Sequence, residues 1–127
     1  MRRQLAAMIV SGAFVAAGNA ALAHHSFAMF DHENPIELEG IVHEFKYTNP
    51  HSYLLVEVKG QDGGVVVWNL EGQAPSLLTR DGWSSQTLKP GDQLKLTIEP
   101  LRSGAPGGRW FIEKTKFKDG RPVAVTH

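Results

Sequence analysis

Apolar and polar residues alternate along much of the chain after residue 35, and a period of two predicts β-strands. In the first such stretch, over 37–47, the alternation changes phase after Gly40. A glycine inside such a pattern indicates a bulge or a tight bend, so this stretch is predicted to be one long, curved strand. Beyond the glycine, the residues that fall on one face are Ile41, His43, Phe45 and Tyr47.

Four later stretches show the same alternation. Residues 53–59 and 65–71 flank the sequence GQDGG, which is typical of a hairpin turn. Residues 93–99 alternate after the turn sequence PGD, and a glycine-rich loop separates them from an apolar stretch at 109–118. The chain is therefore expected to contain five strands.

The segment between the third and fourth strands has a different character. Residues 74–80 read as a short helix, because Pro75 lies in the first turn and Gly82 follows the end. Five strands with a helix between strands 3 and 4 match the Greek-key barrel of the oligonucleotide- and oligosaccharide-binding (OB) fold. An immunoglobulin-like sandwich needs about seven strands and gives that helix no role. The predicted fold class is therefore all-β, a small OB-like barrel over residues 36–127.

The N-terminus reads as a secretory signal peptide over residues 1–23. Arg2 and Arg3 precede an apolar run, and the sequence Ala-Leu-Ala at 21–23 fits a signal peptidase site. The run is shorter than the roughly 20 residues that a membrane span needs, although an uncleaved anchor remains the alternative. We expect cleavage after Ala23 and a periplasmic or secreted protein with no membrane span.

Composition narrows the possible chemistry. The chain has 127 residues and no cysteine, so a thiolate metal site and thiol redox chemistry are excluded. Removal of residues 1–23 would take away Arg2 and Arg3, leaving 11 basic against 13 acidic residues and a formal charge of −2. A charge of this sign gives no reason to expect nucleic acid as a partner.

Cleavage after Ala23 would make His24 the first residue of a histidine-rich segment, residues 24–35. The new α-amino group would then lie beside its own imidazole and next to His25, and nitrogen donors so placed suit Cu(II), or failing that Ni(II) or Zn(II). Phe27 and Phe30 are predicted to pack on the domain and so fix the two histidines in place. The alternative is an ordinary polar N-terminus without a metal.

A third imidazole is expected from His51, which follows Asn49-Pro50 at the start of the second strand. An ordinary turn histidine is the competing interpretation. For three other residues the structural interpretation is favoured over a ligand role: His32 as a solvated loop residue, His43 as a hydrogen-bonded core or edge residue, and Met29 as a packing residue.

Four short sequences carry a resemblance to a known family: HHSFAMFD at 24–31, NPHSY at 49–53, WNLEG at 68–72 and LKPGD at 88–92. On these motifs the chain resembles an uncharacterised family of small exported bacterial proteins that carries a domain-of-unknown-function label. The resemblance implies a periplasmic or secreted protein that begins at the double histidine, and it supplies no catalytic residue and no metal. The fold is also similar to that of small periplasmic copper and silver carriers, by analogy alone.

Two functions are carried forward from the sequence. The first is a metal-binding protein that holds a copper ion through His24, His25 and His51, for storage, delivery or tolerance. The second is a metal-independent module that binds a glycan, a peptide or another periplasmic protein on the barrel face. An enzyme is not expected, because the strand carboxylates alternate with apolar residues as solvated faces do. The aromatic residues available to the second function are Tyr53, Trp68, Trp83, Trp110 and Phe111.

Overall fold

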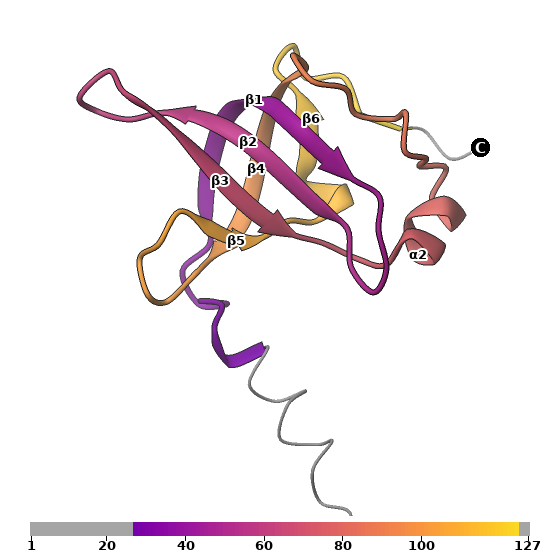
Figure 1. Ribbon diagram of the computed structural model, residues 1–127, viewed down its shortest axis with the longest axis horizontal. Helices are drawn as coiled ribbons and strands as arrows, with labels where there is room; N and C mark the ends of the chain where they lie inside the picture. Colours follow the sequence, from indigo (N-terminus) through magenta and orange to yellow (C-terminus); the bar gives the residue numbers. More distant parts are fainter. Residues whose placement is uncertain (1–26, 125–127) are drawn as a thin grey trace, which may run out of the picture.

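The computed structural model describes residues 27–124, which are drawn in colour in Figure 1. The predicted signal peptide and the predicted ligands His24 and His25 lie outside the described residues. Neither helix within the described part has the length and apolar character that crossing a membrane requires. The elements of that part are β1 (Ile36–Lys46), β2 (Tyr53–Lys59), β3 (Val65–Glu71), α2 (Pro75–Arg80), β4 (Gln93–Pro100), β5 (Gly107–Arg109), the 3-10 helix η1 (Ile112–Lys114) and β6 (Thr115–Phe117).

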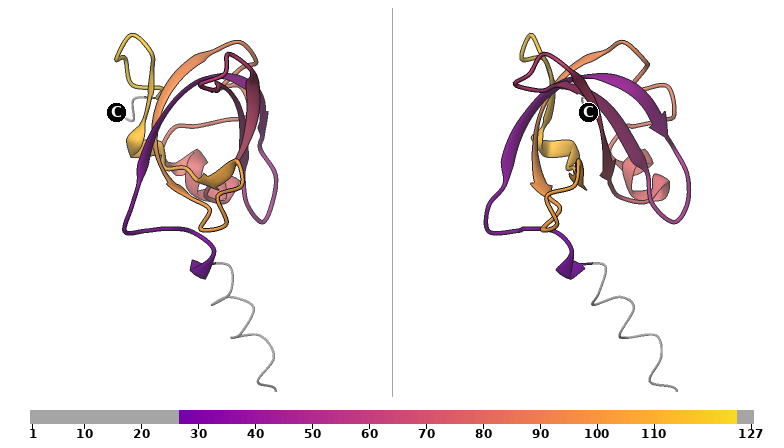
Figure 2. Two further views of the ribbon diagram at one scale, coloured as in Figure 1. Left: turned by 90° about the vertical axis from the view of Figure 1, so that its left-hand side faces the viewer. Right: turned by 60° about the vertical axis from the view of Figure 1, so that its left-hand side comes forward.

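The strands close into a five-stranded barrel. Neighbouring strands follow the order β1-β2-β3-β5-β4, and β4 pairs again with β1 to close the ring. β3 and β5 run parallel, whereas the other pairs in the ring are antiparallel. Figure 2 shows the strands curving around the enclosed core. The predicted all-β, OB-like barrel with a short helix between its third and fourth strands is confirmed.

β1 takes part in two halves of the barrel because it bends at Gly40. Its first half pairs with β4 and its second half with β2. A Cβ atom on Gly40 would lie 2.3 Å from Val56 Cγ1 and 2.6 Å from the Glu57 carbonyl oxygen, so no larger residue fits without a shift. The predicted bend at this glycine is confirmed.

The phase of β1 after the bend differs from the prediction. The register shifts at a bulge between Val42 and Glu44, not at the glycine. Val42 is therefore buried at 2% exposure, whereas Ile41 is 42% exposed. The expected shared face of Ile41, His43, Phe45 and Tyr47 was wrong, because an extra residue in a bulge turns the side chains that follow it to the opposite face.

The last predicted strand, 109–118, is broken in two. β5 ends at Arg109, Trp110 turns into the core at 1% exposure, and the turn of η1 separates β5 from β6. The Thr115 hydroxyl closes this turn by donating to the Phe111 carbonyl at 2.7 Å. β4 consequently pairs with β5 at its end and with β6 near its start.

Aromatic side chains fill the end of the barrel that α2 covers. The ring centroids of Trp83 and Trp110 lie 5.4 Å apart, and Phe45 packs edge-on against both at 6.0 Å. Leu78 of α2 is fully buried against this cluster. Trp83 and Trp110 are therefore core residues and offer no stacking surface to a partner. The other apolar residues of the core are Leu38, Val42, Leu54, Val56, Leu70, Leu88, Leu94, Leu96 and Ile98.

Candidate functional site

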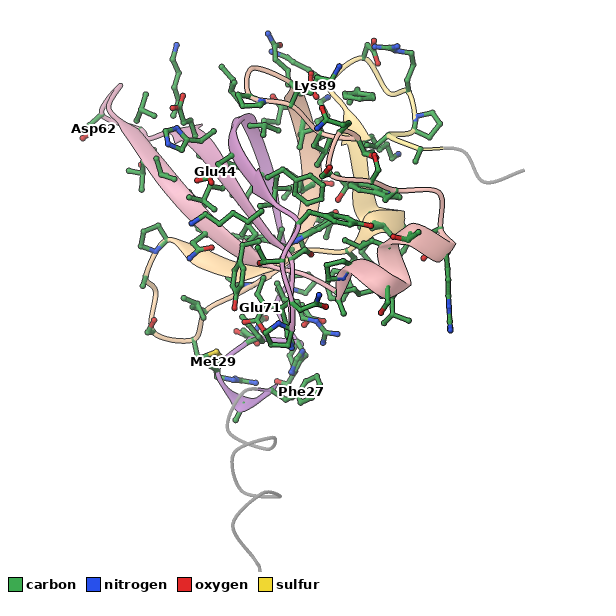
Figure 3. The ribbon with its side chains drawn as sticks, turned by 45° about the vertical axis from the view of Figure 1, so that its right-hand side comes forward. Phe27, Met29, Glu44, Asp62, Glu71 and Lys89 are labelled. Carbon is green, nitrogen blue, oxygen red and sulfur yellow. The ribbon has the colours of Figure 1, made fainter. Side chains whose placement is uncertain are left out.

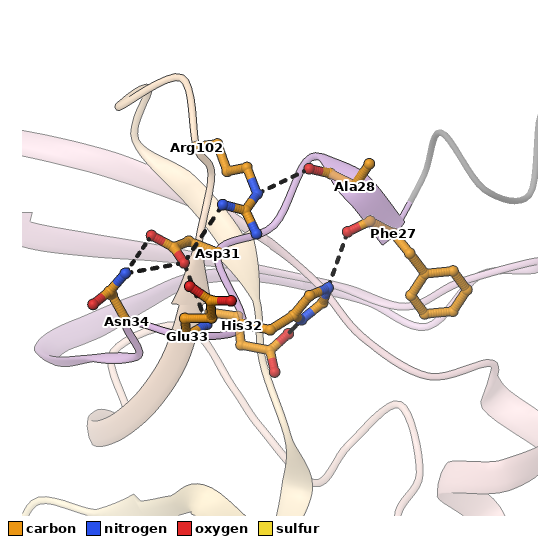
Figure 4. Close-up of polar contacts among 8 residues, drawn as sticks. Phe27, Ala28, Asp31, His32, Glu33, Asn34 and Arg102 are labelled. Atoms are coloured by element: carbon orange, nitrogen blue, oxygen red, sulfur yellow. Dashed lines mark hydrogen bonds and ion pairs between the residues drawn. The ribbon is translucent and has the colours of Figure 1, made fainter.

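The segment that precedes β1 is fixed to the end of β4 and to the β4–β5 loop. The Asp31 N–H donates to the Pro100 carbonyl at 2.8 Å, and the Arg102 N–H donates to the Met29 carbonyl at 2.9 Å. The Arg102 side chain reaches back to the same segment, with Nε donating to the Ala28 carbonyl at 3.1 Å (Figure 4). The residues that directly follow the predicted histidine ligands are thus bound to the barrel.

Both phenylalanines of this segment contact the barrel, as predicted. Phe30 is 5% exposed and forms a β-bridge with Leu101. Phe27 keeps 55% exposure, but its ring lies over the guanidinium of Arg109, 5.3 Å from Cζ to the ring centroid. The Phe111 ring covers the same guanidinium at 5.1 Å, and such cation–π contacts are attractive. Arg109 therefore links the N-terminal segment to β5.

Arg109 lies between two carboxylates on the outer surface of the barrel. The register places Glu71 of β3 opposite it on one side and Glu99 of β4 opposite it on the other. Their strand neighbours Leu70 and Ile98 are fully buried, so by the alternation of a strand these charged side chains point outward. The result is a row of alternating charge: acid, base, acid.

Each of the two carboxylates also contacts a histidine. His51 Nδ1 lies 2.6 Å from Glu71 Oε1, and His32 Nδ1 lies 2.6 Å from Glu99 Oε2. His51 belongs to the loop between β1 and β2, which contains the cis peptide bond between Asn49 and Pro50. A carboxylate at Nδ1 favours the tautomer with its proton there, which leaves Nε2 as the nitrogen with a lone pair.

His32 is bound at both nitrogens. Besides the contact with Glu99, its Nε2 lies 3.0 Å from the carbonyl oxygen of Phe27 (Figure 4). Both neighbours are oxygen atoms, so both ring nitrogens of His32 are in contact with the rest of the protein. His32 is exposed in the turn before β1, as expected of a solvated loop residue, but its two contacts also hold the N-terminal segment against β4.

His43 lies elsewhere on the barrel. Its Nδ1 is 2.9 Å from Glu57 Oε1, which confirms the expected hydrogen-bonded edge histidine. Glu57 pairs with Val67, four residues before Glu71 on β3. At about 3.3 Å per strand residue, this histidine is separated from the Glu71 region by about 13 Å.

The described residues do not form a complete metal site. Among residues 27–124, no group of three or more histidine, aspartate or glutamate side chains lies close enough together to hold an ion. His51 and Glu71 come together, but the predicted site also needs His24 and His25, which lie outside the described residues. The structure thus describes the position of one predicted ligand, His51. It also shows that the segment from Phe27 onward, which follows the other two in the sequence, is bound to the barrel.

A cleft runs beside the His51–Glu71 contact. Figure 3 shows Phe27, Met29 and Glu71 gathered at this end of the molecule. Met29 is 47% exposed, so the expectation that it is a packing residue does not hold for its whole side chain. The residues that line the cleft are Met29, Phe30, Tyr53, Asn69, Glu71, Leu101, Pro106, Gly107 and Gly108.

The carboxylate of Asp31 orders the turn before β1. Hydrogen bonds from the Asn34 side-chain amide and the Glu33 N–H, together with the Arg102 guanidinium 3.8 Å away, hold its pKa below the ordinary value of 3.8. Figure 4 shows Glu33, Asn34 and Arg102 around the Asp31 carboxylate. The turn therefore carries a charged anchor next to the phenylalanines that hold the N-terminal segment.

Sequence reasoning missed Glu71, Glu99 and Arg109. The two glutamates look like the other solvated strand carboxylates, and Arg109 follows a glycine-rich loop. Only the pairing of β5 between β3 and β4 brings the three side chains into one row. Gly108 was the one hint in the sequence that β5 packs closely against another strand. A Cβ there would lie 2.4 Å from the Glu99 carbonyl oxygen, but the sequence does not show which strand lies there.

One family profile matches the chain, over residues 13–111, and it describes a family of unknown function (DUF6152). The matched range includes the two N-terminal histidines, His51 and every strand of the closed barrel. No curated protein and no solved structure matches the chain.

Proposed function

The chain belongs to this family of unknown function, and we propose that it is a small exported protein that binds a metal ion, most readily copper, through His24, His25 and His51. The ligands of His24 are its α-amino group and its imidazole. The ion would be held for storage, delivery or tolerance.

The observation that carries the proposal is the position of Phe27. Its ring lies on Arg109, and Arg109 is the register neighbour of Glu71, which contacts His51. A chain spans at most about 3.6 Å per residue, so the Cα atom of His25 stays within about 7 Å of that of Phe27, and the Cα atom of His24 within about 11 Å. We therefore expect both N-terminal histidines to reach the surface around His51.

The environment of His51 also suits a ligand. A metal-binding histidine commonly donates its second ring N–H to a carboxylate, which fixes the ring and raises the basicity of the binding nitrogen. Glu71 Oε1 lies 2.6 Å from His51 Nδ1, close enough for that role, and no contact of Nε2 is found among the described residues. His51 is also 47% exposed at its side chain, so an ion can approach.

The donor set favours copper. An amine and imidazoles bind Cu(II) more tightly than Zn(II) or Ni(II), and the chain has no cysteine that would select a thiolate site. Met29 lines the cleft beside Glu71 and is half exposed, so a thioether is available to Cu(I) next to the same residues. The amine must lose its proton to bind, so affinity is expected to fall as the pH drops.

Calorimetric titration with Cu(II) tests the proposal on protein whose chain begins at His24. Acetylation of the His24 α-amino group converts the amine to an amide without adding a new amine, and it is expected to weaken binding most, by at least tenfold. His51→Ala is expected to cost less, and Glu71→Gln less again. His43→Ala is the matched control, because His43 also contacts a glutamate but lies about 13 Å along the barrel. Equal affinity of the acetylated and native forms would refute the terminal-histidine site.

The cleft supports a second candidate, a metal-independent interaction module. Tyr53 and Asn69 come from β2 and β3, and in barrels of this fold that face and its adjoining loops bind oligonucleotides and oligosaccharides. In the presence of a chelator, a glycan or peptide bound there would perturb the amide resonances of Tyr53 and Asn69. Retention of that binding in the acetylated protein would favour this second function.

A further inference from the structure

The first half of β3 has a strand neighbour on one side only. β2 pairs with β3 along its whole length, from Val65 to Glu71. β5 pairs with β3 only from Asn69 onward. Within residues 27–124, the stretch from Val65 to Trp68 therefore has one open edge.

Two hydrogen bonds fix the direction of the backbone groups along this edge. The Gly60 N–H donates to the Gly64 carbonyl at 2.7 Å, and the Gly72 N–H donates to the Ser52 carbonyl at 2.8 Å. In an antiparallel ladder, hydrogen-bonded pairs recur at every second residue. The even-numbered residues of β3 thus bond to β2, and the odd-numbered residues point their N–H and C=O away from it.

The second half of β3 agrees with this alternation. The Asn69 N–H donates to the Pro106 carbonyl at 3.2 Å, and the Glu71 carbonyl accepts from the Trp110 N–H at 2.9 Å, both on the side of β5. The remaining odd-numbered residues are Val65 and Val67. Their N–H and C=O groups face the open edge, where none of the described residues pairs with them.

The side chains at this edge are apolar. Val65, Val66 and Val67 are 59%, 43% and 40% exposed, and no charged residue interrupts them. Natural proteins usually protect an open edge with a charge, a proline or a bulge, because an apolar edge pairs with other strands. The β2–β3 hairpin also extends past the rest of the barrel (Figure 1), so a partner strand can approach it.

We propose that a second copy of this chain pairs with the edge, antiparallel, about a two-fold axis through Val66. Val65 of one protomer then lies opposite Val67 of its partner, and the reverse holds at the other end. Each of the two pairs exchanges two backbone hydrogen bonds, about four in all. On this edge, two residues with unpaired backbone groups flank one residue that is already bonded to β2. An antiparallel copy of the same edge pairs all of these groups, as a two-fold interface requires.

The charges on β2 agree with this orientation. Lys59 lies opposite Val65, and Glu57 lies opposite Val67. The two-fold pairing therefore places Lys59 of one protomer and Glu57 of its partner at the two ends of the same row, with the two valines between them. These charges are about three strand spacings, or about 14 Å, apart, a distance at which salt screens most of their attraction, so the valines and the backbone hydrogen bonds supply the affinity.

Sedimentation velocity over a series of concentrations tests the pairing. The protein is used as it is isolated from the cell, with a chelator present so that the result does not depend on the proposed metal site. The average sedimentation coefficient of the wild type is expected to rise with concentration. Val65→Pro removes an outward N–H that β2 does not use, and it should abolish this rise. Thermal unfolding near the wild-type temperature shows that the variant is folded.

Two further variants separate backbone pairing from other causes. Val67→Lys keeps the backbone N–H but places a charge on the edge, so it should also prevent association even if Val65→Pro fails to fold. Val65→Thr is the matched control, because it keeps the N–H and a β-branched side chain, and association should persist. The proposal is wrong if the wild type stays monomeric up to millimolar concentration, if Val67→Lys associates like the wild type, or if Val65→Thr loses association completely.

Discussion

At the scale of single residues, the three described histidines share one feature: each places Nδ1 against a glutamate of a neighbouring strand. What separates their roles is the other nitrogen. His32 Nε2 contacts the Phe27 carbonyl, so this residue fastens the N-terminal segment. His51 shows no such contact among the described residues, and it lies against Glu71, the register neighbour of Arg109, which keeps it the candidate ligand.

Asp31 gives the segment a pH dependence that can be measured. Its native-state pKa lies below the ordinary value of 3.8, chiefly because of the hydrogen bond from Asn34. Ionised Asp31 therefore stabilises the native state above the unfolded-state pKa, and this contribution is lost as the pH falls through the lower native-state pKa.

We expect Asp31→Asn to be less stable than the wild type at about pH 7 and to approach it at about pH 2.5, since protonated Asp31 no longer offers a carboxylate. Urea unfolding followed by circular dichroism at both pH values measures the difference. Asp81→Asn removes one carboxylate elsewhere and serves as the control for net charge. A constant difference between Asp31→Asn and wild type at the two pH values would contradict the role of the ionised group.

At the scale of elements, the barrel depends on one strand that serves both of its halves. β1 pairs with β4 before Gly40 and with β2 after it, and the close approach of Val56 at this point permits only a hydrogen atom. The glycine is thus required by packing, not by an unusual backbone angle.

Gly40→Ala is expected to destabilise the barrel by about 1–3 kcal/mol, the usual cost of overpacking a core. The added Cβ would lie 2.6 Å from the Glu57 carbonyl oxygen, which cannot move without breaking the ladder. The free energy of unfolding in urea measures this loss. Gly64→Ala, whose Cβ would meet only the flexible Asp62 side chain at 3.2 Å, is the matched control. Equal stability of the two variants would show that β1 bends without this constraint.

At the scale of the whole molecule, closure of the barrel brings three distant segments to one end. The N-terminal segment, the β1–β2 loop with His51, and the pairing of β5 between β3 and β4 meet around Arg109. The described part of the chain begins at this end of the barrel, so the proposed function depends on where the exported chain begins.

The exported protein is expected to begin at His24, because the apolar run and Ala-Leu-Ala before it fit a signal peptidase site. Intact mass spectrometry of protein from the periplasmic fraction gives the first residue directly. An Ile9→Asp variant places a charge inside the apolar run and leaves Ala-Leu-Ala intact, so it tests whether the apolar run, and not the cleavage site alone, is needed for export. A mature chain that begins at any other residue would remove the proposed amine ligand.

Much of the fold could be predicted because strand alternation is a local property. Each of the first four strands was found within two residues of its ends, and the helix within one, since a period of two, a hairpin turn and a proline in a first turn are all visible over a few residues. The bulge after Val42 and the break between β5 and β6 were not found. The bulge and the break both depend on pairing with other strands, and such pairing cannot be predicted from a local sequence pattern.

The sequence by itself determined the first four strands, the order of elements that selects this barrel, the bend at Gly40 and the candidacy of His51. The tertiary structure alone decided the row of Glu71, Arg109 and Glu99, the double contact of His32 and the open edge at Val65 and Val67. These features depend on register, the alignment of strands that are distant in sequence. Register decides which charged side chains become neighbours and which backbone groups stay unpaired, and it is fixed only when the whole barrel closes.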